Sequence, residues 1–198
     1  MTLRERRRTE TKTEILDAAW ALCRDVGLAG LSLRELAEQV GMRAPSLYSY
    51  FESKNAIYDA MFRQGYEQFG EDMTAVVAAG AADRDGLEQG ARAFFGFCTA
   101  DPQRYQLLFQ RTIPGFEPSP ESWATAVEQF EVMRRTFAES GLGGDEAVDL
   151  WTALLTGLTD QQISNDPGGD RWERLIGQAV DMFMDHVGAP PRTTRREQ

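Results

Sequence analysis

The chain has 198 residues, 42% of them hydrophobic, and a formal net charge of −10 with a sequence pI near 4.7. This length can hold one large domain or a small domain joined to a larger one, with a core that needs no disulfides. The acidity is uneven, because residues 1–58 carry nine Lys/Arg against eight Asp/Glu, and residues 59–198 carry twelve against twenty-three. A near-neutral head on an acidic body can bind a polyanion only where the head presents its basic groups.

Two features argue against a secreted or membrane protein. The basic N-terminus MTLRERRRTETK has no apolar segment behind it, and the longest apolar run, 75–82, is broken by Gly80. Cys23 and Cys98 match no C-x-x-C metal spacing and are interpreted as small buried hydrophobes, with a redox pair as the minor alternative. We therefore expect a cytoplasmic protein that binds no metal and no membrane.

Helical periodicity dominates, and no segment alternates like a strand. The first helix is predicted from Thr9 to Val26, with Gly27 as its stop. In the stretch LSLRE, Ser32 and Glu35 have the spacing of a capping box, which starts a second helix. That helix is predicted to end at Gly41.

A short third helix is predicted to begin at Ala44, after a turn over residues 41–43. Pro45 falls in its first turn, where a missing N–H costs nothing. Leu47 and Phe51, four residues apart, point to the core. Ser53 is predicted to cap a fourth helix that runs to about Ala79, and residues 80–86 are interpreted as a turn. Further helices are predicted at about 86–99, 102–111, 121–139, 144–164 and 170–187.

These elements predict an all-α protein of about nine helices with two domains. Residues 1–58 form a head with a basic N-terminal arm, residues 59–188 form a helical body, and residues 189–198 form a disordered tail. No internal repeat is evident.

Two short helices joined by a tight turn containing Gly describe a helix-turn-helix, which reads the major groove of DNA. Small residues at the start of the third helix let its N-terminus approach the bases, while longer polar side chains reach phosphates. The alternative is an ordinary all-α protein, in which Tyr48 and Tyr50 are half-buried aromatics. The candidate DNA contacts are Arg34, Arg43, Ala44, Pro45, Ser46, Tyr48, Ser49, Tyr50 and Lys54.

Residues 9–58 strongly resemble the N-terminal domain of the TetR family of transcriptional repressors. The match is ILDAAWALCRDVGLAGLSLRELAEQVGMRAPSLYSYFESKNAIYDAMF. The resemblance implies phosphate contacts by Tyr48 and Lys54, and base contacts by the other candidates apart from Arg43. Tyr50 stands where many relatives have histidine, and Arg43 where a capping Ser or Thr is frequent. Both departures bear on the operator sequence rather than on DNA binding.

The rest of the chain resembles the effector and dimerisation domain of that family more loosely. The resemblance implies a ligand cavity among the helices, and a subgroup carries Trp followed by His-Gly in a late helix. Here Trp151 is present but Thr156-Gly157 replaces the His-Gly pair, so a ligand role for that histidine does not transfer. We expect a small, hydrophobic effector among aromatic residues, which at helical spacing are otherwise ordinary core. The predicted ligand contacts are Phe97, Tyr105, Phe109, Trp123, Phe130 and Trp151.

The last two predicted helices each show an apolar stripe too wide for a single neighbour. Part of each stripe can serve an intramolecular core, and the remainder favours a homodimer through a four-helix interface. The predicted interface residues are Trp151, Leu154, Leu155, Leu158, Ile176, Ala179, Val180 and Phe183.

No phosphate-binding, nucleophile-elbow or zinc-protease motif is present, and the single histidine, His186, cannot build a metal site with distant cysteines. We therefore predict no enzymatic activity and no cofactor. The predicted function is a repressor that an effector releases from a two-fold-symmetric operator. The alternatives are a helical enzyme acting on a hydrophobic molecule and a helical protein-interaction adaptor.

Overall fold

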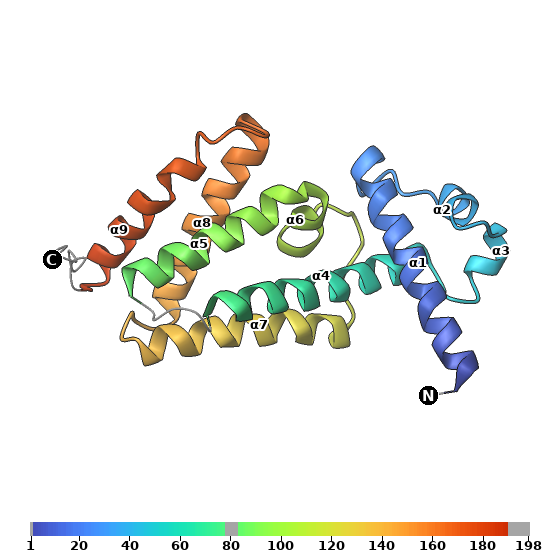
Figure 1. Ribbon diagram of the computed structural model, residues 1–198, viewed down its shortest axis with the longest axis horizontal. Helices are drawn as coiled ribbons and strands as arrows, with labels where there is room; N and C mark the ends of the chain where they lie inside the picture. The colour runs from blue at the N-terminus through green and yellow to red at the C-terminus, as the bar shows by residue number, and fades with distance from the viewer. Residues whose placement is uncertain (1, 78–82, 190–198) are drawn as a thin grey trace, which may run out of the picture. The chain divides into compact units, whose positions relative to one another are not determined.

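The computed structural model describes residues 2–77 and 83–189. Within these ranges every regular element is a helix, which confirms the predicted all-α class. Figure 1 shows their order along the chain. The helices of the described residues are α1 (Leu3–Val26), α2 (Leu33–Gln39), α3 (Ala44–Leu47), α4 (Lys54–Val77), α5 (Arg84–Ala100), α6 (Pro102–Phe109), α7 (Pro120–Glu139), α8 (Asp145–Asn165), the 3-10 helix η1 (Glu173–Leu175) and α9 (Ile176–His186).

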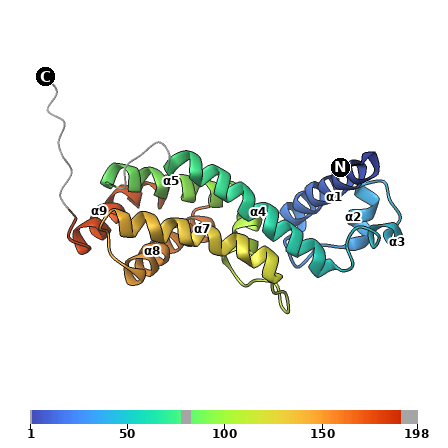
Figure 2. The same cartoon turned by 90° about the horizontal axis from the view of Figure 1, so that it is seen from below.

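The described residues form two compact units. Unit 1 contains residues within 1–67 and 101–126, and unit 2 contains residues within 68–100 and 127–198. The long helices α4 and α7, labelled in Figures 1 and 2, give their first part to unit 1 and the rest to unit 2. Compactness thus groups residues 101–126 with the head, while the predicted division by role at residue 58 stays a prediction.

The first helix begins earlier than the predicted start at Thr9. The Thr2 hydroxyl accepts a hydrogen bond from the backbone N of Glu5 (3.2 Å), and the Glu5 carboxylate accepts one from Thr2 N (2.7 Å). This reciprocal capping box satisfies two of the free N–H groups at the helix start. The basic N-terminus is therefore helical from Leu3 and not an extended arm.

The last helix begins later than its predicted range of 170–187. The Gln162 side chain accepts a hydrogen bond from Trp172 N (2.9 Å). The Asp166 carboxylate accepts one from Arg171 N (2.9 Å), and this bond is the largest cause of a lowered pKa of Asp166. Because α8 holds the connecting loop through these bonds, helical structure resumes only at η1 and α9.

The remaining predicted helices agree with α2 to α8 to within about two residues at each described end. The predicted end at Ala79, the turn residues 80–82 and the tail residues 190–198 lie outside the described residues. None of the described helices combines the length and apolarity that crossing a bilayer requires.

In unit 1, α1 packs against α2 and α6, and α2 packs against α3. The Trp20 indole donates to Gln64 Oε1 (2.9 Å), which joins α1 to α4. Asp101 caps α6 by accepting from Arg104 N (3.1 Å), and it also pairs with Arg24 of α1 (2.9 Å). The buried core residues of unit 1 include Ile15, Ala19, Cys23, Leu36, Ala37, Leu47, Phe51, Ile57, Tyr58 and Met61.

In unit 2, α5 packs against α8 and α9 around an apolar cluster. The Trp151 ring lies 5.0 Å from the Phe183 ring, and Phe137 approaches both. The cluster consists of Leu87, Ala91, Phe95, Phe137, Leu142, Ala147, Val148, Trp151, Leu155, Ile176, Val180, Phe183 and Met184.

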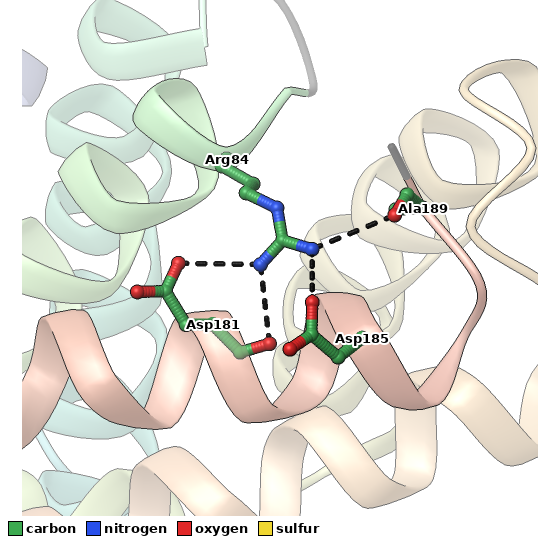
Figure 3. Close-up of polar contacts among 4 residues, drawn as sticks. All are labelled: Arg84, Asp181, Asp185 and Ala189. Carbon is green, nitrogen blue, oxygen red and sulfur yellow. Dashed lines mark hydrogen bonds and ion pairs between the residues drawn. The ribbon is translucent and has the colours of Figure 1, made fainter. Parts of the chain in front are cut away.

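A buried arginine ties the start of α5 to the end of α9 (Figure 3). The Arg84 side chain is 7% exposed, and its guanidinium donates to the Asp181 carboxylate and carbonyl (both 3.2 Å) and to the Asp185 carboxylate. It also reaches the Ala189 carbonyl (3.5 Å). The bond to Asp185 is the largest cause of a raised pKa of Arg84.

Most of the residues predicted for a dimer interface are buried within the single chain. Trp151, Leu155, Ile176, Val180 and Phe183 belong to the unit 2 cluster, and Ala179 is 6% exposed. Packing within a single chain thus accounts for the part of each apolar stripe that faces the unit 2 cluster. On the same two helices Leu150 and Met182 are exposed, whereas Leu154 and Leu158 are partly buried against the cluster and keep some contact with solvent.

Candidate nucleic-acid interface

The predicted DNA contacts surround the turn between α2 and α3, whose geometry follows from local sequence. The Ser32 hydroxyl accepts from Glu35 N (3.4 Å) and caps α2. At the other end Gly41 has φ +68°, and the bonds Met42 N to Ala37 O (2.8 Å) and Gly41 N to Glu38 O (3.1 Å) complete a Schellman motif. Glycine adopts this left-handed conformation without steric cost, so the chain turns sharply into α3.

The third helix has an inner and an outer side. Leu47 is 1% exposed and Phe51 6% exposed, as their spacing of four residues predicts. We call residues 43–50 the recognition segment. Its outer side chains are exposed at Arg43, Pro45, Ser46, Tyr48 and Ser49, whereas Ala44 and Tyr50 are half-buried.

Arg34 stands on the exposed side of α2. Its guanidinium pairs with Glu38 one turn later (3.0 Å), with side chains 84% and 63% exposed. An exposed pair of this kind stabilises a helix by about 0.3–0.5 kcal/mol. The side chain can therefore leave Glu38 for a phosphate or a base at small cost.

Lys54 begins α4 and is half-buried. Its ammonium donates to the Ala29 carbonyl (3.2 Å) and lies 5.5 Å from the centre of the Tyr58 ring. An ammonium has three donors, so the single bond to Ala29 leaves capacity for an anion. Ser53 Oγ accepts from Ala56 N (3.1 Å) and caps the same helix, as predicted.

Two buried side chains that can lose a proton, Tyr58 and Cys23, lie behind this surface. The Tyr58 hydroxyl donates to the Leu28 carbonyl in the loop between α1 and α2. Burial raises the pKa of Tyr58 to about 12 and the pKa of the Cys23 thiol to about 11. Both groups are therefore protonated at neutral pH, and a thiol held protonated is a poor nucleophile.

Sequence reasoning missed the contacts that α1 makes with the recognition segment. The Arg8 guanidinium donates to the Ser49 carbonyl (2.6 Å) and lies 5.2 Å from the centre of the Tyr50 ring. One turn later, the Lys12 ammonium lies 5.3 Å from the centre of the Phe51 ring. The sequence did contain a signal for the early helix start. TLRE at residues 2–5 repeats the capping spacing of SLRE at 32–35, and a helix that starts there includes Arg8.

Unit 1 also contains a cavity of about 300 Å³ beside α6 and the loop that follows it. Two of the predicted ligand contacts, Phe109 and Trp123, line it, and the buried Tyr105 ring lies 5.8 Å from Phe109. The lining is mainly aromatic and aliphatic. It consists of Phe62, Leu107, Leu108, Phe109, Gln110, Arg111, Thr112, Ile113, Phe116, Glu117, Pro118 and Trp123.

The other predicted ligand contacts belong to unit 2. Phe97 is buried with its ring 5.2 Å from Phe69, Phe130 is 38% exposed, and Trp151 lies in the apolar cluster. Among the described residues, no group of His, Cys, Asp and Glu side chains has the arrangement of a metal site.

The arrangement around the recognition segment suits binding rather than covalent chemistry. Exposed hydroxyls and guanidinium groups surround a helix start that carries only small side chains. Such groups donate to phosphate oxygens and to base edges, and small residues allow close approach.

Residues 15–61 match the family described as bacterial regulatory proteins, tetR family. The tetracycline repressor protein class C of Escherichia coli is 43% identical over 166 residues, covering 80% of this chain and 69% of that protein. The chain spans about half the length of the HTH-type transcriptional regulator Rv1816 of Mycobacterium tuberculosis, at 27% identity over 119 residues.

The fold recurs in a crystal structure of a TetR variant from Acinetobacter baumannii in complex with minocycline. The TM-score is 0.62 at 22% identity, and the alignment covers 88% of this chain and 94% of that one. The matched family consists of regulatory proteins, which supports the prediction that the chain is not an enzyme. On the strength of the helix-turn-helix geometry and these matches, the chain belongs to the TetR family of bacterial transcriptional regulators.

Proposed function

We propose that the protein represses transcription by binding a two-fold-symmetric operator through the recognition segment. The observation that carries this proposal is the division of the recognition segment into a buried side, with Leu47, and an outer side on which Arg43, Ser46, Tyr48 and Ser49 are exposed. A repressor role is supported by the likeness to a tetracycline repressor. Arg34, Ser46 and Tyr50 read bases, and Tyr48 and Lys54 bind phosphates.

The repressor acts as a homodimer, since reading a two-fold site needs two heads about 34–36 Å apart. The exposed apolar side chains of α8 and α9 support this assembly: Leu150 is 45% exposed and Met182 is 62% exposed. Leu154 and Leu158 continue the same stripe. Burying such residues in a four-helix interface removes apolar surface from water.

The cavity of unit 1 holds a small effector of mainly hydrophobic character. Its volume of about 300 Å³ falls at the lower end of small-molecule sites. Four aromatic residues line it, and Gln110 and Arg111 provide polar groups that can orient a ligand. A structural relative of the same fold holds minocycline, which supports a small molecule as the kind of effector.

The cavity and the head are joined through α4. Phe116 of the cavity lining lies edge-to-face against the Tyr58 ring (5.6 Å), and the Tyr58 hydroxyl bonds to Leu28 in the head. The neighbouring Asp59 carboxylate accepts hydrogen bonds from the Ser119 and Ser122 hydroxyls (3.0 and 2.9 Å) at the start of α7. Movement of the loop that follows α6 therefore shifts α4 through these contacts, and α4 in turn moves the head.

The experiment is a fluorescence titration of duplex DNA with the whole protein at several salt concentrations. Binding that weakens steeply with salt, and that is lost when Ser46 and Tyr48 are both changed to alanine, is the expected result. Coupling of about 1–3 kcal/mol is expected between effector and operator, so each weakens the other by the same factor. Failure to bind any duplex at low salt would overturn the proposal.

A further inference from the structure

Side chains near the start of α1 pack against the end of the recognition segment. Thr2 and Glu5 cap this helix, so Arg8 stands on a formed helical turn and not on an extended arm. Arg8 and Lys12 are four residues apart and therefore face the same way. Arg8 contacts Tyr50, the last residue of the recognition segment, and Lys12 contacts Phe51, the residue that follows it.

Three separate interactions converge on the end of the recognition segment. Arg8 Nη2 donates to the Ser49 carbonyl (2.6 Å), and the same guanidinium covers the Tyr50 ring at 5.2 Å. The Ser49 hydroxyl in turn donates to the Ser46 carbonyl (2.7 Å). Arg8 thus holds both the Ser49 backbone and the Tyr50 ring, although it precedes Ser49 by forty-one residues in the chain.

This double contact depends on the shape of the arginine side chain. A planar guanidinium can stack its face on an aromatic ring while an N–H at its edge donates to a carbonyl. A lysine ammonium keeps the charge but has no plane with which to satisfy both contacts in one geometry. Tyr50 is half-buried, so its orientation is set by such neighbours and not by free rotation in solvent.

We propose that Arg8 is a positioning residue, which fixes the orientation of Tyr50 and thereby sets base preference at the end of the recognition segment. This inference rests on the proposed DNA binding. Arg8 acts through Tyr50, so its loss changes which base pairs are preferred in addition to weakening binding. A plain phosphate contact would instead weaken binding to every sequence alike.

The test is a double-mutant cycle of Arg8→Ala and Tyr50→Ala, measured on the preferred duplex and on a panel with single base-pair changes. We expect each single variant to lose discrimination of about tenfold at the same base pair. The double variant is expected to lose little more than either one, because the two residues act as a unit. Arg8→Lys is expected to lose discrimination while keeping the positive charge, because an ammonium cannot make both contacts.

Arg4→Ala is the matched control. Arg4 lies one turn before Arg8, is exposed, and has no hydrogen bond or ion pair within the described part of the chain. Its removal takes away one positive charge, so both variants lower the salt dependence equally, but Arg4→Ala leaves base preference unchanged. Circular dichroism of each variant checks that the head remains folded.

Two outcomes would overturn the inference while the proposed function stands. One is additivity of Arg8→Ala and Tyr50→Ala to within about twofold. The other is a loss by Arg8→Ala that is equal for all duplexes, as for Arg4→Ala. If the unaltered protein binds no duplex, the proposed function fails, and the inference fails with it.

Discussion

The two compact units use similar helices for different ends. Unit 2 gathers apolar side chains from α5, α7, α8 and α9 into one cluster and closes it with the buried Arg84. Unit 1 leaves Tyr48 54% exposed and holds its parts together with polar contacts between distant segments, such as Arg24 with Asp101. The difference indicates that unit 2 mainly supplies a closed apolar core, whereas unit 1 keeps the exposed polar surface of the recognition segment, which we propose binds DNA.

The largest loss of stability is expected when a large side chain is removed from the core of unit 2. Trp151→Ala removes a side chain that is 4% exposed and packs on Phe137 and Phe183. The free energy of unfolding is expected to fall by about 3–5 kcal/mol, as for large-to-small changes in cores. Urea unfolding measures it. Trp123→Ala, at a side chain 51% exposed, is the control and should cost much less.

Changes at the predicted DNA contacts, in the recognition segment and beside it, should leave stability nearly unchanged and alter DNA binding. Ser46→Ala and Arg34→Ala each remove a predicted base contact, with an expected loss of about 1–3 kcal/mol in discrimination at particular base pairs. Lys54→Ala should instead weaken binding to all sequences and flatten the salt dependence. Fluorescence anisotropy measures both effects.

Arg63→Ala serves as the control for these variants, because Arg63 is exposed on α4 and outside the predicted contacts. Unchanged affinity and preference in all three test variants, with folding intact, would show that the predicted contacts are wrong.

Asp101 tests how far unit 1 depends on polar contacts. Its carboxylate is nearly buried, caps α6 and pairs with Arg24. Asp101→Ala is expected to lower the free energy of unfolding by about 0.5–2 kcal/mol, the usual cost of a lost cap. Asp101→Asn keeps an acceptor for the cap and should cost less. Equal stability of Asp101→Ala and the unaltered protein in urea would contradict this view of unit 1.

The last expected effect is confined to alkaline solution and is a loss of stability at high pH. Burial raises the pKa of Cys23 from 9.0 to about 11, so the folded state keeps its proton where the unfolded state loses it. The contribution of the protonated Cys23 thiol to the free energy of unfolding is fully present below pH 9. It is lost as the pH rises toward 11, at on the order of 1 kcal/mol per pH unit.

The effect can be measured by urea unfolding at a series of pH values. Tyr58, with its pKa raised to about 12, should extend the decline above pH 10. Cys23→Ala should remove the part that begins at pH 9. A decline that is identical in this variant would exclude Cys23 as its source.

Local signals made the helix-turn-helix predictable. The Ser32 cap, the Gly41 stop and the spacing of Leu47 and Phe51 all act within a few residues, so the sequence contains their full cause. The early start of α1 was equally local, through Thr2 and Glu5, but that signal was overlooked.

Contacts between distant residues were not predictable in this way. The bonds of Arg8 to Ser49, and of Asp59 to Ser119, join residues forty-one and sixty positions apart, and no periodicity marks them. The late start of α9 has a similar origin, because Gln162 holds the preceding loop from the neighbouring helix. Division of the apolar stripes between core and surface likewise depends on which helices pack together.

Selection of bound duplexes from a random pool by the purified whole protein tests the central claim most directly. The account predicts a consensus of two inverted half-sites, with centres about one helical turn apart or a multiple of it, because two recognition segments enter the major groove together. Recovery of sequences with no consensus, or of a single unpaired half-site, would contradict it.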